Sequence, residues 1–214
     1  MKVVIIDYNA GNLSSLTNSL NTVAKNFKSK IEVSVTKNPE DFKYADRLIL
    51  PGVGDFSSCK KNLFEIVGMH ESLKDYVISK CRPILGICIG MQLMTLRSFE
   101  RGAHEGLKFF SAEVKKLTKT DGNIRIPHMG WNTVFLNKYE NKDFFFSIDK
   151  EDFYFVHSFY VDCKKRSNIL AYVNYGKKIT AAICKDNIIG VQFHPEKSQN
   201  QGQRFLSEFL LWKP

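Results

Sequence analysis

The first half of this 214-residue sequence alternates short apolar runs with amphipathic stretches, and that alternation restricts the chain to few folds. Because strands that alternate with helices join through right-handed crossovers, they form parallel sheets covered on both faces. The sequence therefore predicts an α/β fold with a mostly parallel central sheet flanked by helices. The apolar runs that have the length and residue types of buried strands are residues 2–7, 31–35, 47–50 and 83–87.

The amphipathic stretches between these runs carry apolar residues at helical spacing. The first stretch follows Asn12, whose side chain can accept a hydrogen bond from the first turn of a helix that buries Leu16 and Leu20. These helices are the elements expected to cover the sheet. Further helices are predicted at residues 56–67, 71–80, 89–97 and 204–212.

The second half of the sequence changes to strand-like segments rich in β-branched and aromatic residues. Asp186-Asn187 separates two of these segments and resembles a hairpin turn. No internal repeat or Pro/Gly-rich linker marks a boundary, so we expect one domain over residues 1–214, with an added antiparallel region in this half. The predicted strands are residues 113–117, 133–136, 153–161, 169–175, 180–184 and 188–193.

An excess of basic residues gives the chain a formal charge of +9, from 31 Lys and Arg against 22 Asp and Glu. Such a surplus is compatible with nucleic acid, an anionic membrane or an acidic partner. However, the basic residues are dispersed in pairs and are not interleaved with aromatic residues, as base-stacking surfaces require. No apolar run approaches the roughly 18 residues of a membrane span. We therefore expect no nucleic-acid partner and no membrane partner.

Five cysteines, with no Cys-x-x-Cys pair and no export signal, fit neither a disulfide framework nor a metal site. We expect a cytoplasmic protein without a metal or cofactor. His128 and His157 are predicted to be hydrogen-bonded strand residues, with a general-base role as a lesser alternative. Four of the cysteines are predicted to pack as small apolar groups, namely Cys59, Cys81, Cys163 and Cys184.

The fifth cysteine, Cys88, lies in Gly86-Ile87-Cys88-Ile89-Gly90, between a predicted strand and a predicted helix. A nucleophile at such a junction needs a very tight turn, and glycines two residues before and after it remove side chains that would collide. The N-terminus of the following helix favours the thiolate, which is the nucleophilic form. On this pentapeptide alone, a reactive cysteine and a small buried cysteine are equally supported.

A candidate base follows the last predicted strand, in His194-Pro195-Glu196. Pro195 favours an extended backbone, on which the flanking side chains point the same way and Glu196 can accept from one ring nitrogen of His194. The other ring nitrogen would then face Cys88. Alone, this tripeptide would be a strand-end histidine beside a solvated glutamate. Together with the glycine-flanked cysteine, it predicts a catalytic triad of Cys88, His194 and Glu196.

The segment Pro51-Gly52-Val53-Gly54 ends another predicted strand, and loops at the carboxyl ends of parallel strands share one crevice. Backbone N–H groups of Gly52, Val53 or Gly54 could therefore bind an oxyanion, with the Ile89 N–H as the second donor. By itself the segment is an ordinary strand exit, so this prediction depends on the other two motifs.

These motifs resemble those of the class-I glutamine amidotransferases, which carry Gly-x-Cys-x-Gly-x-Gln, His-Pro-Glu and Pro-Gly-x-Gly. The resemblance is strongest to the glutaminase subunits of imidazole glycerol phosphate synthase. Asn9 departs from a glycine usual in that family, Phe159 departs from a frequent tyrosine, and residues 98–108 carry fewer glycines and more charge. The stretches that carry the resemblance are residues 6–13, 51–55, 86–92, 127–132, 155–158 and 194–198.

The resemblance implies that Cys88 attacks the side-chain amide of glutamine and that His194 transfers the protons. The ammonia would pass to a (β/α)8-barrel cyclase subunit in a heterodimer, which makes imidazole glycerol phosphate and aminoimidazole carboxamide ribonucleotide in histidine biosynthesis. It also implies that residues 51–54 reorient when the partner is loaded. Matching positions assign glutamine binding to Gln92, Ser158 and Phe159, and the partner interface to Asn12, Trp131, Tyr154 and Lys197.

Two alternatives stay open at the level of sequence. A paralogous glutaminase would use the same chemistry to supply ammonia to a sugar amidotransferase in surface-glycan synthesis. A non-catalytic binding or chaperone-like relative would retain the glycine-flanked cysteine without needing the triad. The presence of Cys88, His194 and Glu196 together argues against this second alternative.

Overall fold

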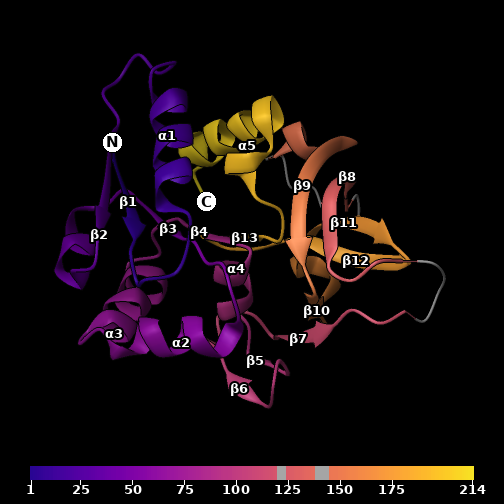
Figure 1. Ribbon diagram of the computed structural model, residues 1–214. Coiled ribbons are helices and arrows are strands. Elements are labelled where there is room, and N and C mark those ends of the chain that lie inside the picture. The colour runs from indigo at the N-terminus through magenta and orange to yellow at the C-terminus, as the bar shows by residue number, and fades with distance from the viewer. Residues whose placement is uncertain (120–123, 138–144) are drawn as a thin grey trace.

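A nine-stranded sheet organises the computed structural model, which describes residues 1–119, 124–137 and 145–214 (Figure 1). Five strands at one side of this sheet are parallel to one another, as the alternation of apolar and amphipathic segments predicts. In spatial order these strands are β2 (Glu32–Thr36), β1 (Lys2–Ile6), β3 (Arg47–Leu50), β4 (Ile84–Ile87) and β13 (Ile188–Val191).

The antiparallel region predicted for the second half continues the same sheet beyond β13. Asp186, which adopts a positive φ of 49°, makes the predicted hairpin turn before β13. The α/β class is thus confirmed, with parallel and antiparallel strands joined in one sheet. The antiparallel strands are, in spatial order, β12 (Lys177–Lys185), β11 (Ile169–Tyr175), β8 (His128–Leu136) and β9 (Glu151–His157).

Helices cover both faces of the parallel half (Figure 1). On one face, α1 (Leu13–Ala24) packs against α5 (Gln199–Leu211), and the Asn12 side chain caps α1 by accepting from the Ser15 N–H. On the other face lie α2 (Phe56–Glu65), α3 (Met69–Lys74), its π-helical continuation Asp75–Ser79, and α4 (Ile89–Leu93). None of the helices within the described ranges is long and apolar enough to cross a membrane.

A second, four-stranded sheet lies beside the antiparallel half. The predicted strand 153–161 is wrong as a single element, because the chain bends at Ser158 and the two halves join different sheets. The strands of the smaller sheet are β10 (Phe159–Cys163), β7 (Ala112–Lys116), β5 (Arg97–Ser98) and β6 (His104–Glu105).

Two further predictions are wrong in detail. The helix predicted at residues 89–97 ends at Leu93, because the carbonyls of Leu93 and Thr95 accept hydrogen bonds from the N–H groups of Leu107 and Lys108. The returning segment therefore takes the place of the next helical turn. Cys81 is exposed, whereas the other cysteines are buried as predicted.

Candidate active site

Cys88 stands alone between β4 and α4, in a backbone conformation that side-chain-bearing residues rarely adopt (φ 53°, ψ −109°). The flanking glycines are required by close packing. A Cβ at Gly90 would lie 1.8 Å from the Leu50 carbonyl oxygen, and one at Gly86 would lie 2.8 Å from the Met91 nitrogen. This strained turn places the sulfur at the carboxyl ends of the parallel strands, in the crevice where ligands bind in such sheets.

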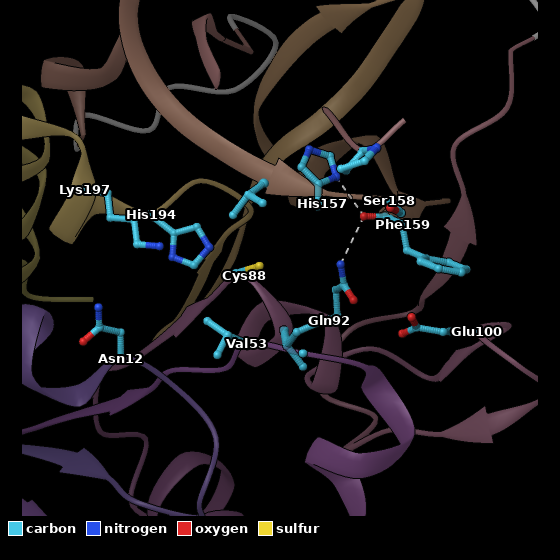
Figure 2. Close-up of a pocket in the computed structure, with 14 residues that line it drawn as sticks. Asn12, Val53, Cys88, Gln92, Glu100, His157, Ser158, Phe159, His194 and Lys197 are labelled. Atoms are coloured by element: carbon cyan, nitrogen blue, oxygen red, sulfur yellow. Dashed lines mark hydrogen bonds between the residues drawn. The ribbon is translucent and has the colours of Figure 1, made fainter. Parts of the chain in front are cut away.

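His194 and Glu196 form a buried pair beside Cys88. The ring Nδ1 of His194 donates to the Glu196 carboxylate at 2.8 Å, and both side chains are almost fully buried. Figure 2 shows the other edge of the ring turned toward the Cys88 sulfur. The extended backbone predicted for this tripeptide is wrong, because Pro195–Lys197 form a 3-10 turn. In this turn the Lys197 N–H donates to the His194 carbonyl and the Ser198 N–H donates to the Pro195 carbonyl.

The electrostatic surroundings of His194 favour its protonated form. Burial lowers the pKa of the His194 ring, but the negative charges of Cys88 and Glu196 raise it by a larger amount, so that the pKa is about 10. Its Nε2 is buried and makes no hydrogen bond within the part of the chain that the structure describes. A protonated nitrogen that faces a thiol and has no other partner is suited to transfer a proton to a leaving group.

These groups line a pocket of about 440 Å³ (Figure 2). Gln92, Ser158 and Phe159 lie on one side of the Cys88 sulfur, while Asn12 and Lys197 lie on the other, beyond His194. The pocket therefore brings together the predicted nucleophile, the predicted base and the residues assigned to glutamine binding.

Gln92 presents a hydrogen-bond acceptor that has no partner. Its Nε2 donates to the Phe159 carbonyl at 3.1 Å and to the side chain of Gln192 at 3.0 Å. Its Oε1 is buried and unpaired within the described residues. Sequence reasoning missed Gln192, whose Nε2 lies 3.5 Å from the Cys88 sulfur. A signal was present, since Gln192 is a polar residue inside the apolar run before His194.

Two buried histidines support the Phe159 carbonyl from the opposite direction. Since a carbonyl only accepts, His157 donates to it from Nδ1 at 2.9 Å, and its Nε2 contacts Nδ1 of His128 at 2.9 Å. Burial lowers the pKa of His157 to about 3 and that of His128 to about 4, so both rings are neutral at neutral pH. The prediction that they are hydrogen-bonded strand histidines is confirmed. At Phe159 it is thus the backbone, not the ring, that faces Gln92.

The structure does not present the predicted oxyanion donors as a free pair. The Ile89 N–H donates to the Gly52 carbonyl at 3.3 Å, so this carbonyl occupies the donor that an oxyanion would need. Gly52 has no room for a side chain, because a Cβ there would lie 2.7 Å from the Tyr8 hydroxyl oxygen. Gly54 has a φ of 107° and open space around its Cα. We call residues 51–54 the oxyanion loop.

Of the four residues assigned to a partner interface, Asn12 and Lys197 line the pocket, whereas Trp131 and Tyr154 do not. Trp131 and Tyr154 are opposite each other across β8 and β9, with ring centroids 6.2 Å apart. The Lys197 ammonium lies 5.8 Å from the Tyr154 ring centroid, and Trp131 is 48 % exposed. Asn12 lines the same pocket as Lys197, and its side chain caps α1.

Asn9, which stands where the resemblance leads us to expect glycine, fits the backbone at this position without strain. Asn9 adopts a φ of 59°, the left-handed region that glycine occupies readily and asparagine tolerates. Its N–H donates to the Asp7 carboxylate at 3.0 Å, and its side chain accepts from the Lys37 ammonium at 2.7 Å. Asn9 therefore holds a backbone conformation that is also open to glycine.

Comparison with known proteins agrees with this geometry. The family model for "Glutamine amidotransferase class-I" matches residues 4–212, and this chain belongs to that family. It is a glutamine amidotransferase, an enzyme. Within the family, it is 41 % identical to the "Imidazole glycerol phosphate synthase subunit HisH" of Mesorhizobium japonicum, over the full length of both chains. It is 47 % identical to "subunit HisH 1" of Campylobacter jejuni, which covers 97 % of this chain and 98 % of that one.

The solved structures give the same fold at lower sequence identity. A glutamine amidotransferase crystal structure superposes with a TM-score of 0.72 at 16 % identity, covering 98 % of this chain and 99 % of the other. A second, from Thermotoga maritima, has a TM-score of 0.58 at 16 % identity, covering 98 % of this chain and 82 % of the other. Across the described ranges, no group of three His, Cys, Asp or Glu side chains could hold a metal ion.

Proposed function

We propose that this chain is the glutaminase subunit of an imidazole glycerol phosphate synthase and hydrolyses glutamine to glutamate and ammonia in histidine biosynthesis. The observation that carries this proposal is the buried His194–Glu196 pair, whose open ring edge faces Cys88 within one pocket. The full-length similarity to HisH subunits supports the assignment to this particular synthase. We take residues 1–214 as one glutaminase domain.

In the first half of the reaction, the Cys88 thiolate attacks the carbon of the glutamine side-chain amide and forms a C–S bond. His194 gives the proton on Nε2 to the amide nitrogen, the C–N bond breaks, and ammonia leaves. A γ-glutamyl thioester remains on Cys88, and the imidazole is neutral. Glu196 holds the ring in the orientation that points Nε2 at the reacting atoms.

In the second half, neutral His194 removes a proton from water, and the resulting hydroxide attacks the thioester carbon. The C–S bond breaks, glutamate is released, and the thiolate beside a protonated His194 is restored.

The unpaired Oε1 of Gln92 accepts a hydrogen bond from an N–H group of the bound glutamine, with Ser158 and Phe159 completing the binding side of the pocket.

Both halves pass through a tetrahedral intermediate whose oxygen carries negative charge, and that charge needs hydrogen-bond donors. The Ile89 N–H and a backbone N–H of the oxyanion loop (Gly52, Val53 or Gly54) are the proposed donors. Because the Gly52 carbonyl bonds to the Ile89 N–H, this state of the loop binds an oxyanion poorly. The chain alone is therefore expected to hydrolyse glutamine slowly until a partner reorients the loop.

The proposed partner is a (β/α)8-barrel cyclase subunit, which covers the pocket mouth and receives the ammonia. Sequestration is chemically necessary, because ammonia that is protonated in bulk water is no longer a nucleophile. Exposed Trp131 and Lys197, half-buried Tyr154 and the pocket-lining Asn12 form the proposed contact.

The test is to mix the chain with the cyclase barrel of its own organism and measure glutamate release with and without the barrel's nucleotide substrate. We expect release to rise strongly when the nucleotide is present, together with formation of imidazole glycerol phosphate. Stimulation by a sugar amidotransferase of that organism, and not by the barrel, would contradict the proposal and favour the surface-glycan alternative.

A further inference from the structure

Three successive carbonyls of the oxyanion loop each accept a hydrogen bond from a different donor. Two of these donors are buried polar side chains, Tyr8 and Cys59, that the proposed chemistry does not use. Cys59 was predicted to be only a small apolar group. The donors are the Tyr8 hydroxyl to Pro51, the Ile89 N–H to Gly52 at 3.3 Å, and the Cys59 thiol to Val53 at 3.3 Å.

The two outer donors are held rigidly. Tyr8 lies two residues after the end of β1 and is fully buried, and Cys59 is the fourth residue of α2 with 2 % of its surface exposed. Because β1 and α2 flank the loop, the carbonyls at its two sides are fixed from within the core.

The middle donor, the Ile89 N–H, differs from the other two because it is the group that an oxyanion would need. Rotation of the single peptide between Gly52 and Val53 removes the carbonyl from Ile89 and turns the Val53 N–H toward the pocket. Such a rotation leaves the two flanking peptides in place. The surroundings permit it, since Val53 is 40 % exposed and a Cβ at Gly54 would meet no atom within 4 Å.

We propose that Tyr8 and Cys59 are positioning residues, which hold the Pro51 and Val53 carbonyls so that activation is confined to rotation of the Gly52–Val53 peptide. The inference rests on the proposed glutaminase function and assigns residues that determine where the second oxyanion donor arrives. If the hydrogen bond from Tyr8 or from Cys59 is lost, the whole loop can shift. The Val53 N–H then reaches the oxyanion in a range of positions. A displacement of about 1 Å in a catalytic group can reduce rate about 100-fold.

The first test compares Tyr8→Phe with Tyr76→Phe, both measured in complex with the cyclase barrel and its nucleotide. Tyr76 is a matched control, because it is also buried and its hydroxyl contacts the carbonyls of Ala45 and Pro83 at 3.4 Å, outside the pocket. For Tyr8→Phe we expect the kcat of glutamate release to fall about 10-fold to 100-fold with KM for glutamine nearly unchanged. Tyr76→Phe is expected to retain both values.

The second test addresses the other flank and remains informative if Tyr8→Phe does not fold. Cys59→Ala removes the donor, whereas Cys59→Ser retains one, so we expect a loss of kcat in the first and recovery in the second. Cys163→Ala is the control, since its thiol also donates to a carbonyl, that of Lys165 at 3.4 Å, in the smaller sheet.

The outcomes separate this inference from the function on which it rests. A wild-type complex that releases no glutamate would overturn both. An active wild type in which Tyr8→Phe behaves like Tyr76→Phe, or loses only KM, would overturn the role of Tyr8. Equal kcat values for Cys59→Ala and Cys59→Ser would overturn the role of Cys59.

Discussion

The proposed proton-transfer groups and the oxyanion loop lie in the same pocket, but only the proton-transfer groups are arranged as the proposed reaction requires. His194 and Glu196 are paired at 2.8 Å, and the free edge of the ring faces Cys88. The Ile89 N–H, by contrast, is occupied by the carbonyl of Gly52. In the proposed mechanism, the groups that transfer protons are therefore in place in the chain alone, whereas the donors for the oxyanion are not.

This difference shows where a glutaminase can be controlled at little energetic cost. The buried charged pair would be expensive to break, because each separated partner would lose compensation in a low-dielectric site. Rotating one peptide exchanges hydrogen bonds of ordinary strength, each worth about 0.5–1.5 kcal/mol. The loop is thus the element that a partner can shift, and the predictions below separate the contribution of each region.

The largest expected effect is on the assembled side. Cys88→Ala removes the only atom that can form the thioester, so glutamate release with the partner present should fall by about 10⁴-fold or more. The measurement is steady-state glutamate production. Cys81→Ala, which removes an exposed thiol, is the control and should behave as wild type. Equal rates for wild type and Cys88→Ala would rule out the triad.

The next effect concerns Glu196. Replacement by Gln removes one of the negative charges that raise the pKa of His194, and it weakens the orientation of the ring. We expect kcat to fall about 100-fold to 1000-fold.

The pH profile gives an independent readout of the same variant. A raised pKa of about 10 keeps His194 protonated at neutral pH, so wild-type kcat should decline only as pH rises toward that value. In Glu196→Gln the pKa of His194 is lower, and the decline should begin at lower pH. Alkaline limbs that coincide would contradict the proposed coupling of Glu196 to His194.

A smaller effect is expected on the binding side of the pocket. His157→Phe removes a donor to the Phe159 carbonyl, which positions Gln92, and should raise KM for glutamine about tenfold with a smaller change in kcat. His70→Phe, at a position where the ring stacks on Phe64, is the control. A loss confined to kcat would indicate that His157 takes part in the chemistry.

The smallest effect is on stability. Asn12→Ala removes the side-chain cap of α1 and should lower the free energy of unfolding by about 1 kcal/mol. Asn12→Ser keeps an acceptor and should retain most of the stability in denaturant titration. If Asn12→Ala unfolds at the same denaturant concentration as wild type, the cap contributes nothing measurable.

The strands of the parallel half and the tight turn at Cys88 could be predicted because their signals are local. The apolar runs at residues 2–7 and 83–87 became β1 and β4, and the glycines around Cys88 mark a turn that only glycine permits. The split of residues 153–161 could not be predicted. No glycine or proline marks the bend at Ser158, and β9 and β10 separate only because their partners lie in different sheets.

The state of the oxyanion loop was beyond sequence for a different reason. The orientation of the Gly52–Val53 peptide depends on a balance of nearly equal hydrogen bonds in three dimensions, which residue types do not record. Likewise, nothing in the sequence distinguishes Cys59, whose thiol reaches Val53, from Cys184, another buried cysteine. Gln192 stands out in the sequence as a polar residue in an apolar run, but its contact with the Cys88 sulfur appears only when two strands distant in sequence are brought together.

The central claim is that the chain alone lacks oxyanion stabilisation but already has its substrate site and its proton-transfer pair. The direct measurement is kcat and KM for glutamate release by the isolated chain and by its complex with the nucleotide-loaded barrel. We predict that the complex has a kcat about 100-fold higher or more, with KM for glutamine changed only slightly. An isolated chain that reaches the kcat of the complex, or a stimulation that lies entirely in KM, would contradict the account.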